Sequence, residues 1–292
     1  MNPDIDNGGP DIDPDADPSA DDGPSDAADP AVLAAIAAFE DTLAQRMATT
    51  VLPTAGGYAV LNARYPHSYA HNRLQVNEPA SAAALLADAD RVLGGAGLAY
   101  RQVSVADARL AAILAPEFLA AGYARYGEVL MVLGTPVAHQ PDHRVRRLPY
   151  RPLVRDAVAR GWRESLPDAA EEVAEQLADR TELVESACAV THHVVLIDGA
   201  VVSRCELYRA GGIAQIENVV TDQPQQGQGL ARAIVLDAID TAGTVDSADS
   251  ADSVPRNEIV FLRADAEDWP RHFYRRLGFR NWAASTVFER TG

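Results

Sequence analysis

The chain has 292 residues, enough for two modest domains or one large one. Its formal charge is -17, and all 25 basic residues are arginine, so the acidic balance argues against nucleic acid or an anionic membrane as the main partner. It has no apolar run of about 18 residues and no basic, apolar N-terminus, so we expect no membrane span and a cytoplasmic location.

Residues 1–30 consist almost entirely of Asp, Pro, Gly, Ser and Ala. Such a segment cannot bury enough apolar surface to offset the entropy lost on ordering. The composition therefore predicts a disordered acidic tail over residues 1–30.

Residues 31–137 alternate helical and strand patterns, which predicts an N-terminal α/β domain. The pattern predicts a helix from Pro30, a strand over 58–63, a short strand over 74–77, a helix over 80–93, a strand over 98–105, a helix over 108–121 and a strand over 127–133.

A polar and aromatic cluster follows the first of these strands. It contains Tyr65, His67, Tyr69, His71 and Asn72. These side chains could line a pocket for an acceptor substrate, or they could form a packed loop.

Residues 138–292 follow a linker with two prolines and form the second predicted domain. The pattern predicts strands over 144–148, 192–197, 200–208, 213–220, 258–263 and 282–289, helices over 152–164 and 169–183, a helix from Leu230 and a last helix that ends at Gly278. Asp198-Gly199 predicts a tight hairpin, and residues 243–257 are a low-complexity loop.

The turn Gln226-Gly227-Gln228-Gly229-Leu230-Ala231 places two glycines at the start of a helix. A helix N-terminus presents unpaired amides and a partial positive charge, so it binds phosphate well. The spacing fits neither a dinucleotide fingerprint nor a nucleotide P-loop. The alternative is a glycine-rich turn that only caps a helix.

Two motifs resemble the GNAT superfamily of N-acetyltransferases. Gln226, Gly229 and Ala231 match the family's acyl-CoA loop, and Phe273-Tyr274-Arg275-Arg276-Leu277-Gly278-Phe279 is similar to the end of its last helix. The resemblance implies an α/β fold with a GNAT-like mixed twisted sheet flanked by helices. Residues 118–123 repeat the second motif without a glycine loop, which indicates that a smaller, degenerate half-domain precedes it.

The resemblance implies that acetyl-CoA lies between two splayed strands, 213–220 and 258–263. The backbone near Val219 and Val220 would pair with the pantetheine arm, and the loop would hold the pyrophosphate. The residues implied in the loop are Gln226, Gly227, Gln228, Gly229, Leu230 and Ala231, with Arg232 either adding a charge contact or lying exposed.

Tyr274 matches the family's general acid for the thiolate, although it could also be a core tyrosine. Because successive side chains of a strand point to opposite faces, we expect Gln215, Glu217 and Val219 to share one face and Asn218 to point the other way. Glu217 is then the candidate base.

Glu206 on the neighbouring strand is the next candidate base. Of the adjacent His192 and His193, at most one could serve, because they point to opposite faces of their strand. Glu217 could also be a surface or structural residue.

We therefore expect an acyl-CoA-dependent N-acyltransferase that transfers acetyl from acetyl-CoA to an amine acceptor within a ternary complex. The alternative is a catalytically inactive module that binds CoA or a partner. No metal is implied, Cys188 and Cys205 are expected to be free thiols, and the chain could act as a homodimer.

Overall fold

A computed structural model of the chain describes residues 28–243, 259–267 and 270–291. The predicted tail (1–30) lies outside the described residues except for 28–30, and so does the predicted low-complexity loop (243–257) except for Gly243. Within the described ranges, no helix is long and apolar enough to cross a membrane.

The N-terminal half alternates strands and helices, as predicted. Helix α1 begins where the Asp29 carboxylate accepts a hydrogen bond from the Ala31 amide at 2.8 Å, with Pro30 in the first turn. The elements are α1 (Pro30–Met47), β1 (Thr50–Thr54), β2 (Gly57–Leu61), η2 (Tyr69–His71), β3 (Arg73–Val76), α2 (Ala82–Ala89), η3 (Asp90–Gly94), β4 (Tyr100–Val105), α3 (Ala108–Ala120) and β5 (Ala124–Leu133).

The C-terminal half continues the same sheet. Its predicted hairpin is confirmed, because Asp198 and Gly199 both have positive φ, 50° and 81°, as a tight two-residue turn requires. The elements are β6 (Val145–Leu148), η4 (Tyr150–Val154), α4 (Arg155–Ser165), α5 (Glu171–Asp179), α6 (Thr181–Ala187), β7 (Ala189–Ile197), β8 (Ala200–Ala210), β9 (Ile213–Thr221), η5 (Gln223–Gln225), α7 (Leu230–Gly243), β10 (Ile259–Asp265), α8 (Pro270–Arg276) and β11 (Phe279–Thr291).

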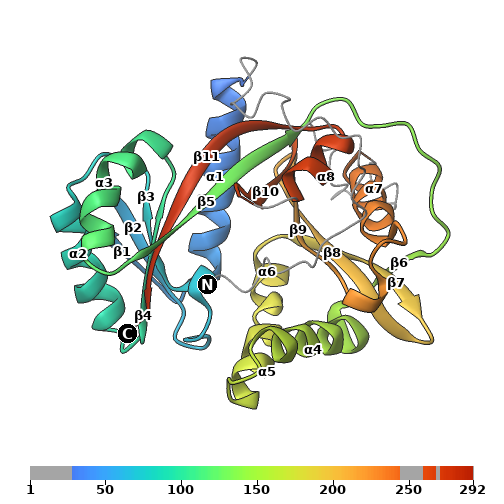
Figure 1. Ribbon diagram of the computed structural model, residues 1–292, viewed down its shortest axis with the longest axis horizontal. Helices are drawn as coiled ribbons and strands as arrows, with labels where there is room; N and C mark the ends of the chain where they lie inside the picture. The colour runs from blue at the N-terminus through green and yellow to red at the C-terminus, as the bar shows by residue number, and fades with distance from the viewer. Residues whose placement is uncertain (1–27, 244–258, 268–269, 292) are drawn as a thin grey trace.

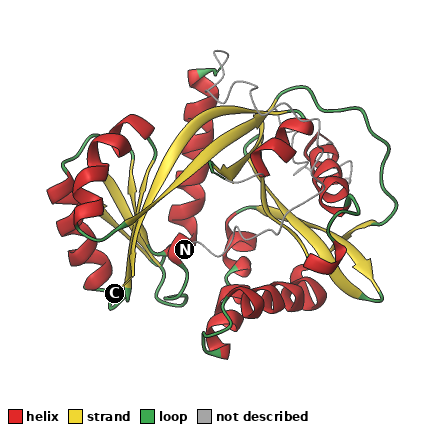
Figure 2. Ribbon diagram, viewed as in Figure 1, coloured by secondary structure: helices red, strands yellow, loops and turns green. Residues whose placement is uncertain are grey.

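All the strands belong to one mixed sheet in the order β1-β2-β3-β4-β11-β5-β10-β9-β8-β7-β6. Helices lie on both sides of its strands (Figure 2). In the C-terminal half, α7 and α8 pack on one face, around Leu207, Ile216 and Ile234. Helices α1 and α6 pack on the other, around Phe39, Tyr208 and Phe261. The predicted mixed sheet flanked by helices is confirmed.

The two halves exchange their last strands. Strand β5 ends the N-terminal half but pairs with β10, and β11 ends the C-terminal half but pairs with β4. The two long strands lie side by side across the middle of the molecule, where they are the green and red ribbons of Figure 1. The sheet therefore runs without a break from one half to the other.

Both halves share one element order, strand, helix, strand, helix, strand, with β3-α2-β4-α3-β5 matching β9-α7-β10-α8-β11. They differ in where the two parallel strands pair. Strands β3 and β4 pair at their carboxyl ends, from Leu74↔Val103 to Val76↔Val105. Strands β9 and β10 pair only at their amino ends. An open gap at the carboxyl ends therefore exists only in the C-terminal half.

Several elements differ from the prediction, and three of these differences have a clear physical reason. Strand β1 was not predicted, because it contains Pro53. The proline is tolerated there because β1 lies at the edge of the sheet. The helix predicted over 169–183 divides at Arg180 into α5 and α6. The last strand begins at Phe279, directly after Gly278, whose φ of 101° ends α8.

A hydrogen bond and an ion pair, both made by Asp237, tie α7 to the strands beneath it. A carboxylate oxygen of Asp237 lies 2.6 Å from Nδ1 of His193, and Arg147 donates two hydrogen bonds of 3.0 Å to the same carboxylate. Burial raises the pKa of Asp237, but the bonds from His193 and Arg147 outweigh it and lower this pKa to about 2. Asp237 is therefore ionised and stabilising at neutral pH.

Asp237→Asn is expected to lower the free energy of unfolding at pH 7 by about 1–2 kcal/mol. Because the folded pKa lies below the unfolded value, this stability is present above about pH 4 and is lost as the pH falls through about 2. Urea unfolding at several pH values measures it. Asp240→Asn, at a more exposed position of the same helix, is the control. If Asp237→Asn lost as much free energy of unfolding near pH 2 as at pH 7, the charge of Asp237 would not be the cause.

Candidate functional site

The centre of the candidate site is the gap between β9 and β10. The two strands pair in parallel only from Ile213↔Ile259 to Gln215↔Phe261. Beyond that point β9 continues to Thr221 along β8, while β10 continues along β5. In the described part of the chain, no strand pairs with the β10-facing edge of residues 216–221. An extended ligand arm can add to such an edge as a strand would.

A β-bulge at Asn218 interrupts β9 beside this gap. Asn218 has a φ of 53°, and the register with β8 shifts between Arg204 and Glu206. The predicted alternation of side chains is therefore wrong beyond Glu217. Asn218 joins the face of Glu206 and donates to its carboxylate at 2.8 Å, whereas Val219 packs into the core under α7.

The glycine loop leads from β9 to the start of α7. Gly227 and Gly229 have φ values of 74° and 71°, which side chains other than glycine rarely adopt. Both are exposed, and the first backbone bond of α7 runs from the Ala233 amide to the Gly229 carbonyl at 3.0 Å. Among the described residues, the amides of 227–232 have no backbone acceptor. They form an open cradle that suits a pyrophosphate.

Neighbouring side chains fix the shape of this loop. The side-chain amide of Gln226 donates to the Thr221 carbonyl at 3.2 Å and closes the turn. Arg144, which the sequence did not indicate, donates to the Gln228 carbonyl at 3.5 Å and pairs with Asp142. Arg232 is exposed on the first turn of α7. The loop is therefore held by its surroundings and its amides face solvent.

Tyr274 lies on the buried side of α8, with its ring against Phe273 and Phe279 at centroid distances of 5.1 and 6.0 Å. Its side chain is buried, and within the described residues its hydroxyl makes no hydrogen bond. Burial, with the nearby Cys205 and Glu217, raises the pKa of Tyr274 well above 10. The phenol therefore keeps its proton throughout the physiological range.

Glu217 lies on β9 just before the bulge and accepts a hydrogen bond of 2.5 Å from the Gln215 side chain. The two residues share one face, as predicted. The charge of Glu217 raises the pKa of Tyr274 and of Tyr208. Glu217 lies on β9 beyond the last residue that pairs with β10, and Tyr274 lies on α8, which packs on the same face of the sheet as α7.

Arg263 of the C-terminal half and two carboxylates of the N-terminal half line the same region. Arg263 of β10 donates to both carboxylate oxygens of Glu40 on α1, at 2.6 and 2.7 Å, and lies 4.0 Å from Glu128 on β5. Arg263 could have been found as the one cation in an apolar strand. Nothing in the sequence of α1 indicated Glu40, because a glutamate on a helix is ordinarily solvated.

The two cysteines are free thiols, as predicted. Cys205 is fully buried, and its burial raises its pKa well above 9. Burial likewise raises the pKa of Cys188 to about 11. A neutral thiol is a poor nucleophile, so neither cysteine is suited to carry an acyl group. No group of three metal-ligating side chains occurs in the described ranges.

The two adjacent histidines point to opposite faces of β7, as predicted. His193 faces α7 and Asp237, and burial lowers its pKa. His192 faces α6, with Nε2 3.2 Å from Glu185 and Nδ1 3.8 Å from Glu206. Only His192 therefore lies on the face that carries Glu206 and Glu217.

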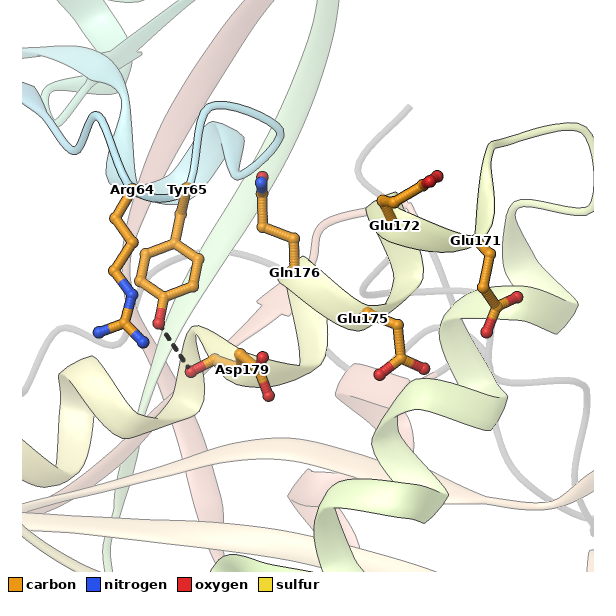
Figure 3. Close-up of a pocket in the computed structure, with 7 residues that line it drawn as sticks. All are labelled: Arg64, Tyr65, Glu171, Glu172, Glu175, Gln176 and Asp179. Carbon is orange, nitrogen blue, oxygen red and sulfur yellow. Dashed lines mark hydrogen bonds between the residues drawn. The ribbon is translucent and has the colours of Figure 1, made fainter.

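The predicted polar-aromatic cluster is mostly a packed loop. The His71 ring bonds to Ser68 at 2.8 Å, Asn72 donates to the Tyr65 carbonyl, and Tyr69 stacks on Tyr100. Tyr65 alone of these side chains lines a pocket of about 380 Å³ against α5 (Figure 3). Its hydroxyl donates to the Asp179 carbonyl at 3.2 Å.

Three of the four acidic side chains that line this pocket pair with arginines. Glu171 and Glu175 pair with Arg163, and Asp179 pairs with Arg151 and Arg155. The contact between the loop and α5 joins the two halves.

Comparison with known proteins supports the geometry. The model of the acetyltransferase (GNAT) family matches residues 153–279. None of the curated proteins matches the chain. Among solved structures, a functionally unknown conserved protein from Staphylococcus epidermidis is 13% identical with a TM-score of 0.65, covering 84% of this chain and 94% of its own.

Two further structures share the fold. A GCN5-related N-acetyltransferase from Kribbella flavida is 16% identical with a TM-score of 0.54, covering 88% of this chain and 95% of its own. A tandem GNAT protein from the clavulanic acid biosynthesis pathway is also 16% identical with a TM-score of 0.50, covering 72% and 69%. These likenesses extend over both halves, which supports a degenerate copy of the fold in the N-terminal half.

Proposed function

Because residues 153–279 form a domain of the GNAT acetyltransferase family, we propose that this protein transfers an acetyl group from acetyl-CoA to an amine. The observation that carries the proposal is the β9–β10 gap, which is open toward the glycine loop at the start of α7. The amides of Gly227 to Ala231 would hold the pyrophosphate. The edge of β9 near Val219 and Val220 would take the pantetheine arm.

Transfer to an amine requires three things of the protein: a neutral nucleophile, a polarised thioester carbonyl and a proton for the leaving thiolate. In this proposal, Glu217 accepts the proton of the amine, directly or through a water. Tyr274, which holds its proton at neutral pH before the reaction, gives it to the thiolate of CoA and then regains a proton from solvent. The nitrogen–carbonyl bond forms as the carbonyl–sulfur bond breaks. The raised pKa values of both cysteines keep their thiols neutral, which favours this direct transfer over an acyl-enzyme.

The N-terminal half contributes structure to the site. Its strand β5 fills the sheet beside β10, and its helix α1 supplies Glu40 to Arg263. With Glu128, Glu206 and Glu217 in the same region, the surroundings of the gap are rich in carboxylates. This charge favours a cationic amine over an anionic acceptor.

A panel of amines, amino acids, aminoglycosides and peptides, assayed for CoA release, tests the function. We expect at least one amine to release CoA with formation of its N-acetyl product, and Glu217→Gln to lower kcat roughly 100-fold at pH 7. Glu164→Gln, an exposed change at the end of α4, should leave kcat unchanged. A silent panel with tight CoA binding would favour a binding module instead.

A further inference from the structure

A line of polar side chains crosses the face of β7, β8 and β9 that lies away from α7. It begins at the Asn218 bulge, continues through Glu206 on β8 and His192 on β7, and ends at Glu185 on α6. The successive distances are 2.8 Å from Asn218 to Glu206, 3.8 Å from Glu206 to His192 and 3.2 Å from His192 to Glu185. One end lies beside Glu217 and the other reaches the surface.

The middle of this line is deeply buried. Glu206 is 1% exposed and His192 is 2% exposed, whereas the Glu185 side chain is 38% exposed. One carboxylate oxygen of Glu206 accepts from both Tyr208 and Asn218. The other oxygen, Oε1, and Nδ1 of His192 face each other, and neither has a hydrogen-bond partner among the described residues. Buried polar atoms without partners are rare and call for an explanation.

The register connects this line to the proposed base. Glu206 and Glu217 are directly opposite each other across β8 and β9, so their side chains lie on the same face. Two carboxylates in such positions repel each other when both are charged, and a proton that arrives at one can pass to the other. Glu217 itself is half-buried and its carboxylate is held by Gln215, so Glu206 offers a proton that it accepts a route away from the gap in which the cofactor would lie.

We propose that Glu206, His192 and Glu185 form a proton relay that carries the acceptor's proton from Glu217 to the surface; this rests on the proposed acetyl transfer. The N–H bond of the amine breaks as Glu217 takes the proton, which passes to Glu206. Glu206 gives it from Oε1 to Nδ1 of His192, and His192 releases the proton on Nε2 to Glu185 and then to water. For a neutral amine, the proton that leaves through the relay balances the proton that Tyr274 takes back from solvent, and no electron is transferred.

Other groups that face the relay cannot take its place at neutral pH. Burial raises the pKa of Tyr150 and of Tyr208, and it raises that of Cys188 to about 11, so all three keep their protons. Besides Glu206 and Glu217, the charged groups near them are arginines, which do not titrate in this range: Arg46, Arg155, Arg180 and Arg204. Imidazole alone exchanges protons readily near pH 7.

The kinetic test is the pH profile of kcat/KM for His192→Gln against His193→Gln. The control changes the adjacent buried histidine on the opposite face. We expect His192→Gln to lose on the order of 10-fold at pH 7, with unchanged KM for acetyl-CoA. The loss should shrink toward about pH 10, because hydroxide from solvent can then remove the proton from Glu217 without the relay. A loss of equal size at all pH values, or no loss, would overturn the relay.

A second test does not depend on turnover. The imidazole signals of the protein's 7 histidines can be followed by NMR, with His192→Gln to assign the signal of His192. Glu206→Gln and Glu185→Gln should each shift the titration midpoint of His192, whereas Glu182→Gln, whose carboxylate pairs with Arg151, should not. An unaltered midpoint in Glu206→Gln would overturn the relay.

The two tests separate the relay from the function on which it rests. If the wild type is active and His192→Gln matches it at every pH, the relay alone is wrong. If the wild type acetylates nothing, the proposed function fails and the relay's role in catalysis fails with it, whatever the NMR titration shows.

Discussion

Gly229→Asp is expected to weaken acetyl-CoA binding at least about 100-fold, as measured by calorimetry. The added carboxylate would stand in the amide cradle at the start of α7, where the pyrophosphate is proposed to lie. It would repel the phosphates and cover the backbone that should contact them. A Cβ at Gly229 meets no atom within 4 Å, so the variant should fold.

Gly211→Asp is the matched control for this change. Gly211 also has a positive φ, 59°, and open space around its Cβ, but it lies in the β8–β9 hairpin, away from the loop. Both variants should lose about 1 kcal/mol of stability from the backbone conformation. Only Gly229→Asp should lose affinity, and equal acetyl-CoA binding by the two proteins would remove the loop from the site.

Tyr274→Phe is expected to lower kcat about 100-fold or more while the Kd for acetyl-CoA changes less than about threefold. The hydroxyl makes no hydrogen bond within the described residues, so phenylalanine fills the same space at little cost in stability. Because the pKa of Tyr274 is raised, its deprotonation should not limit the wild-type rate up to about pH 10. Single-turnover kinetics with a saturating amine separate the chemical step from product release.

Tyr123→Phe provides the comparison for this variant. It removes another buried hydroxyl without a partner among the described residues, but in the N-terminal half. Its kcat should match that of the wild type. If Tyr274→Phe also turns over at the wild-type rate, Tyr274 is a core tyrosine and the thiolate takes its proton from another source.

The parts of the fold that were predicted correctly depend on local chemistry. Asp107 caps α3 through a 2.7 Å bond to Leu110, and the turn at Asp198 needs only its own residues to form. The turn before α7 could be predicted for the same reason, because Gly227 and Gly229 adopt positive φ without help from distant residues.

The parts that were not predicted depend on contacts between distant residues. A strand has the same alternation whichever neighbour it pairs with, so the positions of β5 and β11 in the sheet have no local signature. The bulge at Asn218 changes which side chains meet, but an asparagine within a strand pattern does not predict a bulge. For this reason the sequence placed Val219 on the wrong face and missed the contact between Asn218 and Glu206.

The exchange of β5 and β11 bears on how the protein can be divided. We retain 31–137 and 138–292 as the proposed limits of two repeats, but a fragment of the second alone would lack β5. Its β10 would lose the partner that borders it from Phe261 to Asp265, and β11 would project without β4. Unpaired edges of this kind promote aggregation. The N-terminal half thus covers edges of the C-terminal half's sheet that would otherwise be exposed, so the two halves are expected to fold as one unit.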